Sequence, residues 1–462
     1  MRSRLTSLIL LVLAALSFFA AARLNPELRD MRRDLKITQA DPLENAPPMV
    51  AFTTVALGGF RGVLADLLWL RAGRLQEEGR YFELVQLADW ITKLEPRFTS
   101  VWSFHAWNLA YNISVLFDDP EDRWRWVNSG IALLRDEGLR YNPDNARLLY
   151  ELGWMYQHKI GANLDQAHLF YKRRLAEDMM SLFPGPRPDF GALQAARQSS
   201  AMRDTPLGKS ATTLMEVYKL DPKIMQEVDA AYGPLDWRVA QTHSIYWGYR
   251  SRLVASGQDA LSAERMIFQS LADAFRIGAL FVNLDEDVFI PSPNLDLLPR
   301  VLQAYTDAEK QFPDNASIRN ARRTFCEQAM MILYTYQRNR QGQALFEDLK
   351  NRGLGDDLPE DYESFIKQRF TEEVKNMNDK DALAYVEGFL VQSLFFTALG
   401  DAERAHGFDQ TARAVWQEYM KTRIDPEFKE RTGLPPIEEV RTIALERART
   451  MLQSETVRAR LK

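Results

Sequence analysis

The chain has 462 residues, of which 46% are apolar and 26% are charged, a balance typical of a folded globular protein. Its formal net charge of −5 leaves no basic excess to neutralise a phosphate backbone, so nucleic-acid binding is not expected. The single cysteine, Cys326, excludes an intramolecular disulfide framework.

The N-terminal segment has the pattern of a membrane-targeting sequence. Arg2 and Arg4 precede an uncharged run from Leu5 to Ala22, which Arg23 closes. The run reaches the short end of the roughly 17–25 residues that a transmembrane helix needs. Its end, Phe19-Ala20-Ala21-Ala22, also offers an Ala-x-Ala site for signal peptidase. A retained inner-membrane anchor and a cleaved signal therefore both stay open, and in either case the basic flank places the rest of the chain in a bacterial periplasm.

Helical periodicity runs through most of the chain after residue 50, and strand-like runs such as Ala279–Val282 are short and isolated. In three successive helix pairs, small residues stand about one turn from bulky ones, as closely crossing helices require. Pro96 and Pro143 close the first two pairs. The residues of the pattern are Leu68, Ala72, Leu75, Gly79, Tyr81, Leu84 and Ala88, then Trp102, Ala106, Leu109, Ile131, Leu134 and Gly138, then Leu149, Leu152, Gly153, Tyr156, Ala167 and Tyr171.

This pattern resembles the tetratricopeptide (TPR) family, in which two antiparallel helices form a unit of about 34 residues. Leu152-Gly153-x-x-Tyr156 is the sharpest match, and looser pairs recur at 301–338 and 389–412. Three blocks are also similar to membrane-anchored TPR-like proteins of bacterial envelopes, a group that implies location and fold but no activity: Gly58–Ala72, Tyr81–Trp90 and Tyr232–Arg238. The resemblance implies an all-α fold, a TPR-like α-solenoid of antiparallel helix pairs with an irregular central insertion.

These patterns divide the chain into five parts. The expected parts are a transmembrane or signal helix at 1–23, a linker at 24–50, TPR-like repeats at 51–182, an irregular helical region at 183–296, and TPR-like repeats with a capping helix at 297–462.

The central region departs most from the repeat. A helix is expected to begin in Leu220-Asp221-Pro222 and to run to Tyr232. A helical hairpin of Val239–Ala255 and Ala260–Ile277 is expected next, followed by an acidic, proline-containing loop at Asp285–Asp296. Such a departure suits either a partner surface or a packed insertion, and the sequence leaves both open. The C-terminal stretch from Ile437 to Lys462 is expected to form one amphipathic capping helix.

Tryptophan and arginine, the residue types that dominate protein-binding hot spots, alternate just after an acidic turn. They are Arg123, Trp124, Arg125 and Trp126, and Trp237 with Arg238 forms a second candidate after Gly233-Pro234. Because Trp124 and Trp126 cannot share one face of a helix, at least one is a candidate for exposure. Core packing is the alternative for every one of these residues.

No motif indicates catalysis, a metal or a cofactor. The five histidines form no zinc-binding pair, and Gly58–Gly62 lacks the Lys-Ser/Thr ending of a phosphate-binding loop. The acidic run Asp285–Asp287 lacks the spacing of a calcium loop and is expected to be solvated. His243 and Tyr246 stand in a stretch rich in polar and aromatic groups, which makes them possible ligand-binding residues.

These observations favour a non-enzymatic, membrane-tethered scaffold or adaptor that binds other proteins of a cell-envelope assembly, such as a secretion, pilus, export or transporter complex. Stacked helix pairs form the extended concave surfaces that suit this task. The alternative is an envelope enzyme or glycan-binding protein with its site around Trp237, Arg238 and His243.

Overall fold

The computed structural model describes Ser17, Arg23, Met31 and the ranges 61–283, 288–355, 357–375, 377–422, 433–451 and 455–461. The expected membrane or signal segment at 1–23 and the linker at 24–50 therefore lie outside the described residues, apart from those three positions. The Gly58–Gly62 motif and the acidic run Asp285–Asp287 also lie wholly or mostly outside them.

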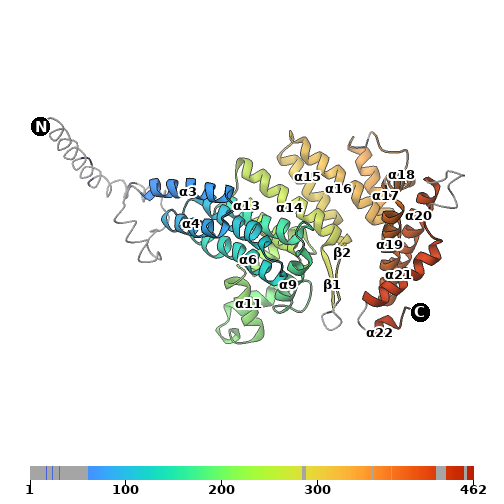
Figure 1. Ribbon diagram of the computed structural model, residues 1–462, viewed down its shortest axis with the longest axis horizontal. Coiled ribbons are helices and arrows are strands. Elements are labelled where there is room, and N and C mark those ends of the chain that lie inside the picture. The colour runs from blue at the N-terminus through green and yellow to red at the C-terminus, as the bar shows by residue number, and fades with distance from the viewer. Residues whose placement is uncertain are drawn as a thin grey trace. The chain divides into compact units, whose positions relative to one another are not determined.

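Most of the described chain is helical and strands are nearly absent from it, in agreement with the expected all-α class (Figure 1). The helices before residue 200 are α3 (Arg61–Glu77), α4 (Tyr81–Leu94), α5 (Thr99–Trp107), α6 (Pro120–Ala132), α7 (Leu139–Tyr141), α8 (Ala146–Trp154), α9 (His168–Met180) and α10 (Phe190–Gln198). π-Helical turns occupy Asn108–Ile113, Leu133–Gly138 and Met155–Gly161. The later helices are α11 (Pro206–Glu216), α12 (Pro222–Tyr232), α13 (Ala240–Val254), α14 (Gly257–Ile277), α15 (Leu298–Gln311), α16 (Ala316–Thr335), α17 (Asn339–Asn351), α18 (Tyr362–Lys375), α19 (Asp379–Leu399), α20 (Ala402–Thr422), α21 (Ile437–Met451) and α22 (Glu455–Arg458).

The chain forms two compact units. The first contains the residues up to Asn108 together with Arg140–Asn142, and the second contains the rest. In the first unit, α3 and α4 form an antiparallel hairpin whose core includes Ala72 and Leu84. Pro96, which was expected to close this pair, offers its carbonyl oxygen to Trp102 Nε1 at 2.9 Å and to the side chain of Asn142 at 2.8 Å.

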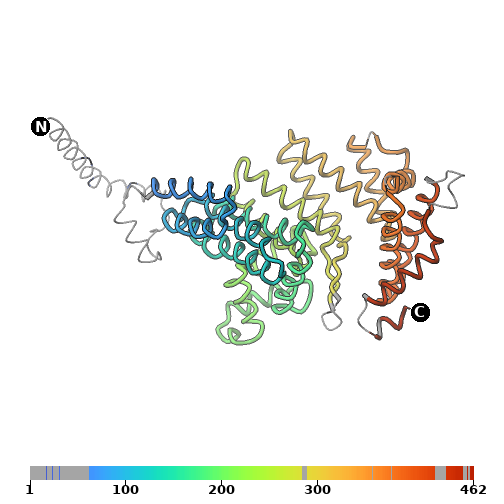
Figure 2. Tube along the Cα trace, in the orientation of Figure 1, coloured from blue at the N-terminus to red at the C-terminus, as the bar shows by residue number. Residues whose placement is uncertain are grey.

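In the second unit many helices pack against the next helix in the chain, but α8 packs against the distant α13. α13 packs against both α8 and α14, α16 packs against α17, and α19 packs against α20, as the chain trace shows (Figure 2). The central helices confirm the expected positions of α12, α13 and α14. Asp221 caps α12, because its side chain accepts a hydrogen bond from the Lys223 N–H.

The loop expected at Asp285–Asp296 contains a strand. β1 (Ala279–Asn283) pairs antiparallel with β2 (Val288–Ser292), and Phe281 stands opposite Ile290. Pro291 stands opposite Leu280, whose N–H and C=O point away from β2 toward Asp236 and Arg238, so the missing N–H of Pro291 costs no ladder bond. The expectation of a loop was wrong here, because prolines and acidic residues concealed a short edge strand.

One helix within the described ranges, α19, is long and apolar enough to span a membrane by length and composition. It packs against α20 and α21, and Leu390 and Phe396 are among its buried residues. A helix packed between other helices of a folded domain has the same apolar composition, so the packing of α19 accounts for its apolar character.

Two glycines of the α19–α20 hairpin provide a matched test of this packing. A Cβ on Gly407 of α20 would clash with the backbone carbonyl of Thr335 at the end of α16, whereas nothing lies within 4 Å of a Cβ on Gly388 of α19. We expect Gly407→Ala to lower the free energy of unfolding by about 1–3 kcal/mol through overpacking. We expect Gly388→Ala to raise it by about 0.5–1 kcal/mol, because alanine favours the helix. Chemical unfolding of the two variants checks both signs, and equal effects would contradict the close approach of α16 and α20.

Candidate partner-binding surfaces

The tryptophan- and arginine-rich segment begins α6. Asp119 caps this helix by accepting a hydrogen bond from the Glu121 N–H. Trp124 is 8% exposed and packs against Tyr171, with ring centroids 5.9 Å apart. Trp126 is half-buried and stacks on Phe117 at 6.0 Å. Neither tryptophan is therefore fully exposed, and Trp124 contributes to the core.

Arg123 belongs to a buried ionic cluster around Asp165. Asp165 Oδ1 accepts hydrogen bonds from Arg123 Nη1 at 3.1 Å and from the Tyr171 hydroxyl at 3.3 Å. Its Oδ2 accepts one from Lys159 Nζ at 2.6 Å. Burial opposes the charged form of the Asp165 carboxyl, but the hydrogen bonds from Lys159 and from the Ala167 N–H hold its pKa below the usual range. Burial lowers the pKa of Lys159, and the carboxylate opposes that change.

These contacts change the interpretation of the first candidate surface. The side chains of Arg123 and Trp124 are both buried where α6 packs against its neighbours, so neither is available to a partner. Arg125 is exposed and pairs with Asp122 at 2.9 Å, so it is the member of the segment that reaches solvent most fully.

The second candidate group is also buried. Trp237 and His243 have no exposed surface, and His243 Nε2 donates to the Trp237 carbonyl oxygen at 3.1 Å. The imidazole stacks on Tyr156 with ring centroids 5.0 Å apart. Burial lowers the pKa of His243 to about 4, so the ring is neutral at neutral pH. The His243 side chain is therefore enclosed by protein and presents no open face to a ligand.

Tyr246 has a structural partner as well. Its hydroxyl accepts a hydrogen bond from the Asp221 N–H at 2.9 Å and donates one to the Lys219 carbonyl oxygen at 3.2 Å. Burial raises the pKa of this phenol to about 12. The hydroxyl thus links α13 to the residues at the start of α12. The Tyr246 side chain, like that of His243, therefore has a structural role in this fold.

Arg238 and Asp236 bind the outer edge of β1. Arg238 Nη2 donates to the Leu280 carbonyl oxygen at 2.7 Å, and Asp236 Oδ2 accepts from the Leu280 N–H at 3.1 Å. The two side chains also pair with each other, with Arg238 Nη2 2.7 Å from Asp236 Oδ2. They satisfy the backbone groups that an edge strand would otherwise present to another strand.

The two faces of the hairpin have different neighbours. On one face, Leu280 and Phe289 pack in a cluster with Ala176 and Val239. On the other, Phe281 meets Phe395 of α19 edge to face, with ring centroids 6.3 Å apart. Because alternate residues of a strand point to opposite faces, this division follows directly from the register of β1 and β2.

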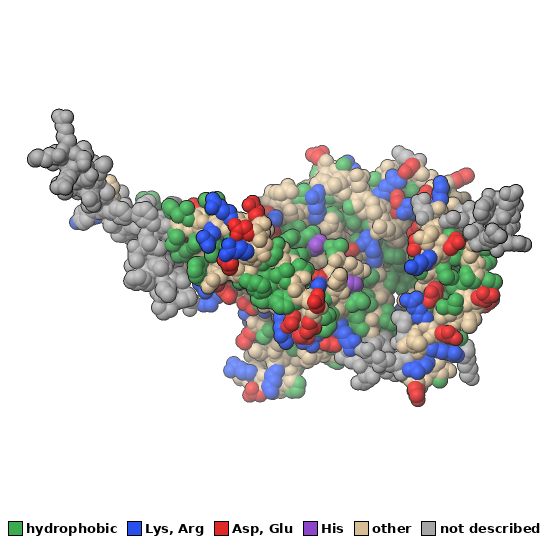
Figure 3. All heavy atoms as spheres, in the orientation of Figure 1, with side chains coloured by type: hydrophobic (Ala, Val, Ile, Leu, Met, Phe, Trp, Pro, Cys, Tyr) green, Lys and Arg blue, Asp and Glu red, His purple; other side chains and the backbone are tan. Residues whose placement is uncertain are grey.

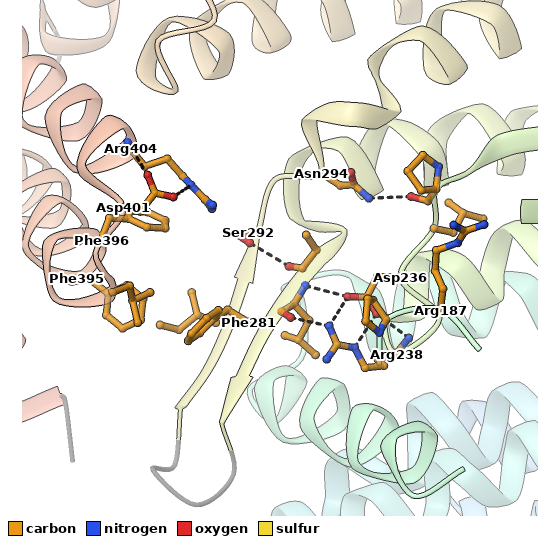
Figure 4. A pocket seen from close by; sticks show the side chains of 17 residues that line it. Arg187, Asp236, Arg238, Phe281, Ser292, Asn294, Phe395, Phe396, Asp401 and Arg404 are labelled. Atoms are coloured by element: carbon orange, nitrogen blue, oxygen red, sulfur yellow. Dashed lines mark hydrogen bonds and ion pairs between the residues drawn. The ribbon is translucent and has the colours of Figure 1, made fainter. Parts of the chain in front are cut away.

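A cavity of about 430 Å³ opens on the second face of the hairpin, and we call it the hairpin pocket (Figure 4). Phe281 projects from β1 toward Phe395, and Phe396 lies beside them on the α19 side. Phe281 keeps 43% of its surface exposed, so an apolar ring is available from the cavity. The hairpin pocket therefore has an aromatic wall on each side.

Paired charges surround these aromatic walls. Arg404 Nε donates to Asp401 at 2.6 Å, and its guanidinium lies 5.0 Å from the centre of the Phe396 ring. Two more arginines line the pocket: Arg238, which pairs with Asp236, and Arg187, whose partner Asp229 lies outside the lining. Asp236 already accepts four hydrogen bonds, so the rim offers a peptide the remaining N–H donors of Arg187 and Arg404 and the remaining lone pairs of Asp401.

A second hollow of about 430 Å³ lies among α14, α16 and the π-helical turn Met155–Gly161. Trp154 stacks on His158 with ring centroids 4.8 Å apart, and the Tyr111 hydroxyl is 3.2 Å from His158 Nδ1. Burial lowers the pKa of His158, with a smaller contribution from Lys159. The other polar side chains that line this second hollow are Gln157, Gln269, Asp273, Arg276, Thr324 and Gln328.

Arg238, which the sequence analysis proposed as a partner-binding residue, lines the hairpin pocket, but the aromatic residues and Arg404 across the pocket were missed. Phe281, Phe395 and Arg404 lie far apart in the chain, and no local pattern connects them. The buried Lys159 did leave a signal, because it stands among apolar residues such as Tyr156 and Ile160 on a helix.

Across the described ranges, no group of three or more histidine, cysteine, aspartate or glutamate side chains is arranged to hold a metal ion. The chain matches no protein-family model, no curated protein and no solved structure.

Proposed function

We propose that this chain is a membrane-tethered protein-binding scaffold of a bacterial cell envelope, and that the hairpin pocket receives a peptide segment of its partner. The aromatic pair Phe281 and Phe395, open to a cavity whose rim carries arginines, is the observation that carries the proposal. Aromatic and arginine side chains at the centre of a hollow are the usual anchors of protein interfaces. The fitting partner segment packs an apolar side chain against the exposed face of Phe281 and places its backbone groups on the rim.

The remaining features support the same function. The helix pairs and the resemblance to TPR units favour a solenoid, which would give the pocket a large supporting surface. The apolar N-terminal run would tether that surface at the inner membrane, with the helical part in the periplasm, and raise its effective concentration toward other membrane components. The alternative enzyme or glycan site around Trp237, Arg238 and His243 receives less support, because these side chains bind one another and the backbone.

Substitution at the pocket tests the proposal. Phe281→Ala removes a ring that is 43% exposed, and we expect recovery of the partner in purifications from native membranes to fall about tenfold or more. Leu253→Ala at the end of α13 removes a side chain that is 60% exposed, and we expect it to leave recovery unchanged. Quantitative mass spectrometry of the purified material compares the two variants with the parent chain. Equal recovery from both, with both folded, would remove the hairpin pocket from the proposal.

A further inference from the structure

Helix α3 is apolar on two opposite faces, and only one of them is covered within the described unit. Ala65, Ala72 and Leu75 are buried against neighbouring helices. On the other side, Val63 and Leu67 are 56% and 59% exposed. Apolar side chains gathered on an uncovered helix face mark a contact surface, so this bare face is expected to have an occupant.

The exposed residues form two parallel rows along the helix. Val63, Leu67 and Leu70 stand four and three residues apart and continue to Arg74, and Leu64 continues to Arg71 in the neighbouring row. Leu70 is 66% exposed, and both arginines are exposed. Each row is therefore apolar over its first half and then reaches an arginine, with the exposed carboxylates Asp66 and Glu77 at the edge of the face. Figure 3 shows hydrophobic and basic side chains side by side over α3.

The two arginines are available to bind an anion. Among the residues that the structure describes, neither Arg71 nor Arg74 has a carboxylate partner. Aliphatic side chains next to unpaired arginines on one helix face are the pattern of a helix that lies in a membrane interface, with its apolar residues among the acyl chains and its cations at the phosphates.

We propose that the exposed face of α3, formed by Val63, Leu64, Leu67, Leu70, Arg71 and Arg74, lies on the surface of an anionic lipid bilayer. The inference rests on the membrane tether of the proposed function. The apolar N-terminal run ends at Ala22, and α3 begins at Arg61, so fewer than 40 residues of chain separate the proposed tether from the helix. The tether would therefore hold α3 near the headgroups, where even a weak surface contact is populated.

The chain itself offers a clean labelling experiment. Cys326 is fully buried, and burial raises the pKa of its thiol to about 12, so an introduced cysteine reacts selectively. Full-length chains carrying Leu67→Cys, Leu70→Cys or, as control, Gln343→Cys on the exposed surface of α17 are labelled with an environment-sensitive fluorophore. They are then reconstituted in vesicles of phosphatidylcholine with phosphatidylglycerol, with and without a lipid-borne quencher.

We expect probes at 67 and 70 to emit at shorter wavelength than the probe at 343 and to be quenched at least threefold more by the labelled lipid. Removal of phosphatidylglycerol is expected to reduce that difference. A wavelength shift without lipid quenching would overturn the proposal and assign the face to protein, either residues 32–60 or a second copy. Flotation of the same samples separates the two claims. Chains that float with unquenched probes retain the tether and lose the α3 contact, and chains that do not float lose both.

Discussion

Replacing Asp165 by asparagine is expected to lower the free energy of unfolding by about 3–5 kcal/mol, because it leaves two buried cations without their carboxylate. The side chains of Asp165, Lys159 and Arg123 are only 6%, 4% and 11% exposed, so solvent cannot replace the lost charge. The measurement is chemical unfolding of the full chain in detergent, followed by tryptophan fluorescence. The matched control is Asp122→Asn, whose partner Arg125 is exposed, and its expected cost is about 0–1 kcal/mol.

The same carboxylate gives the prediction a pH dependence. The folded-state pKa of Asp165 lies below its unfolded value, so its contribution is present above the unfolded pKa of about 4 and is lost as the pH falls through the folded pKa. The parent chain should therefore lose stability below about pH 4 more steeply than Asp165→Asn. The double variant Asp165→Asn/Lys159→Met should recover part of the loss, since one stranded cation is removed. Similar costs for Asp165→Asn and Asp122→Asn would contradict the buried cluster.

Trp237→Ala is expected to lower the free energy of unfolding by about 3–5 kcal/mol, through lost burial and the cavity that remains. The ring is fully buried, meets Phe190 and Tyr246 edge to face, and lies with its Nε1 3.3 Å from Asp229. Trp90→Ala, at a position that is 49% exposed, should cost less than about 1 kcal/mol. Unfolding midpoints of the two variants provide the comparison.

This result also separates the two interpretations of Trp237. If Trp237→Ala preserves stability but abolishes recovery of a partner, the residue is a binding residue, as the sequence first suggested. If it destabilises the chain as strongly as other core tryptophan substitutions, the ring serves the core, and the pocket wall begins at its neighbour Arg238.

Local patterns in the sequence were sufficient for the helices of the central region. The hairpin expected at Val239–Ala255 and Ala260–Ile277 appears as α13 and α14, because its period and its turn are both encoded within a few residues. The expected C-terminal helix at Ile437–Lys462 appears in the described residues as α21 and α22. β2 was missed because its proline and the acidic residues before it look like a loop when the edge position of Pro291 is unknown.

The candidate sites depend on contacts that no local pattern specifies. From the sequence alone, Trp124 and Arg125 are equally good candidates for a binding residue. Packing against Tyr171 buries the Trp124 ring, whereas the Arg125 guanidinium stays exposed. The hairpin pocket brings Phe281 to Phe395 and Asp236 to Leu280, and such pairings arise from tertiary packing. Alternating tryptophan and arginine is therefore compatible with a hot spot and with a core, and burial distinguishes them.

Photo-crosslinking from the hairpin pocket tests the central claim most directly. A benzoylphenylalanine replaces Phe281 in the full-length chain, and a second chain carries it at Leu253, which is also exposed. Both are irradiated in native membranes, and the adducts are identified by mass spectrometry. The expected result is one envelope protein joined at position 281 and not at 253, through a segment with an apolar side chain. The same adducts at both positions, or none at 281 while the chain is folded and in the membrane, would contradict a partner in the pocket.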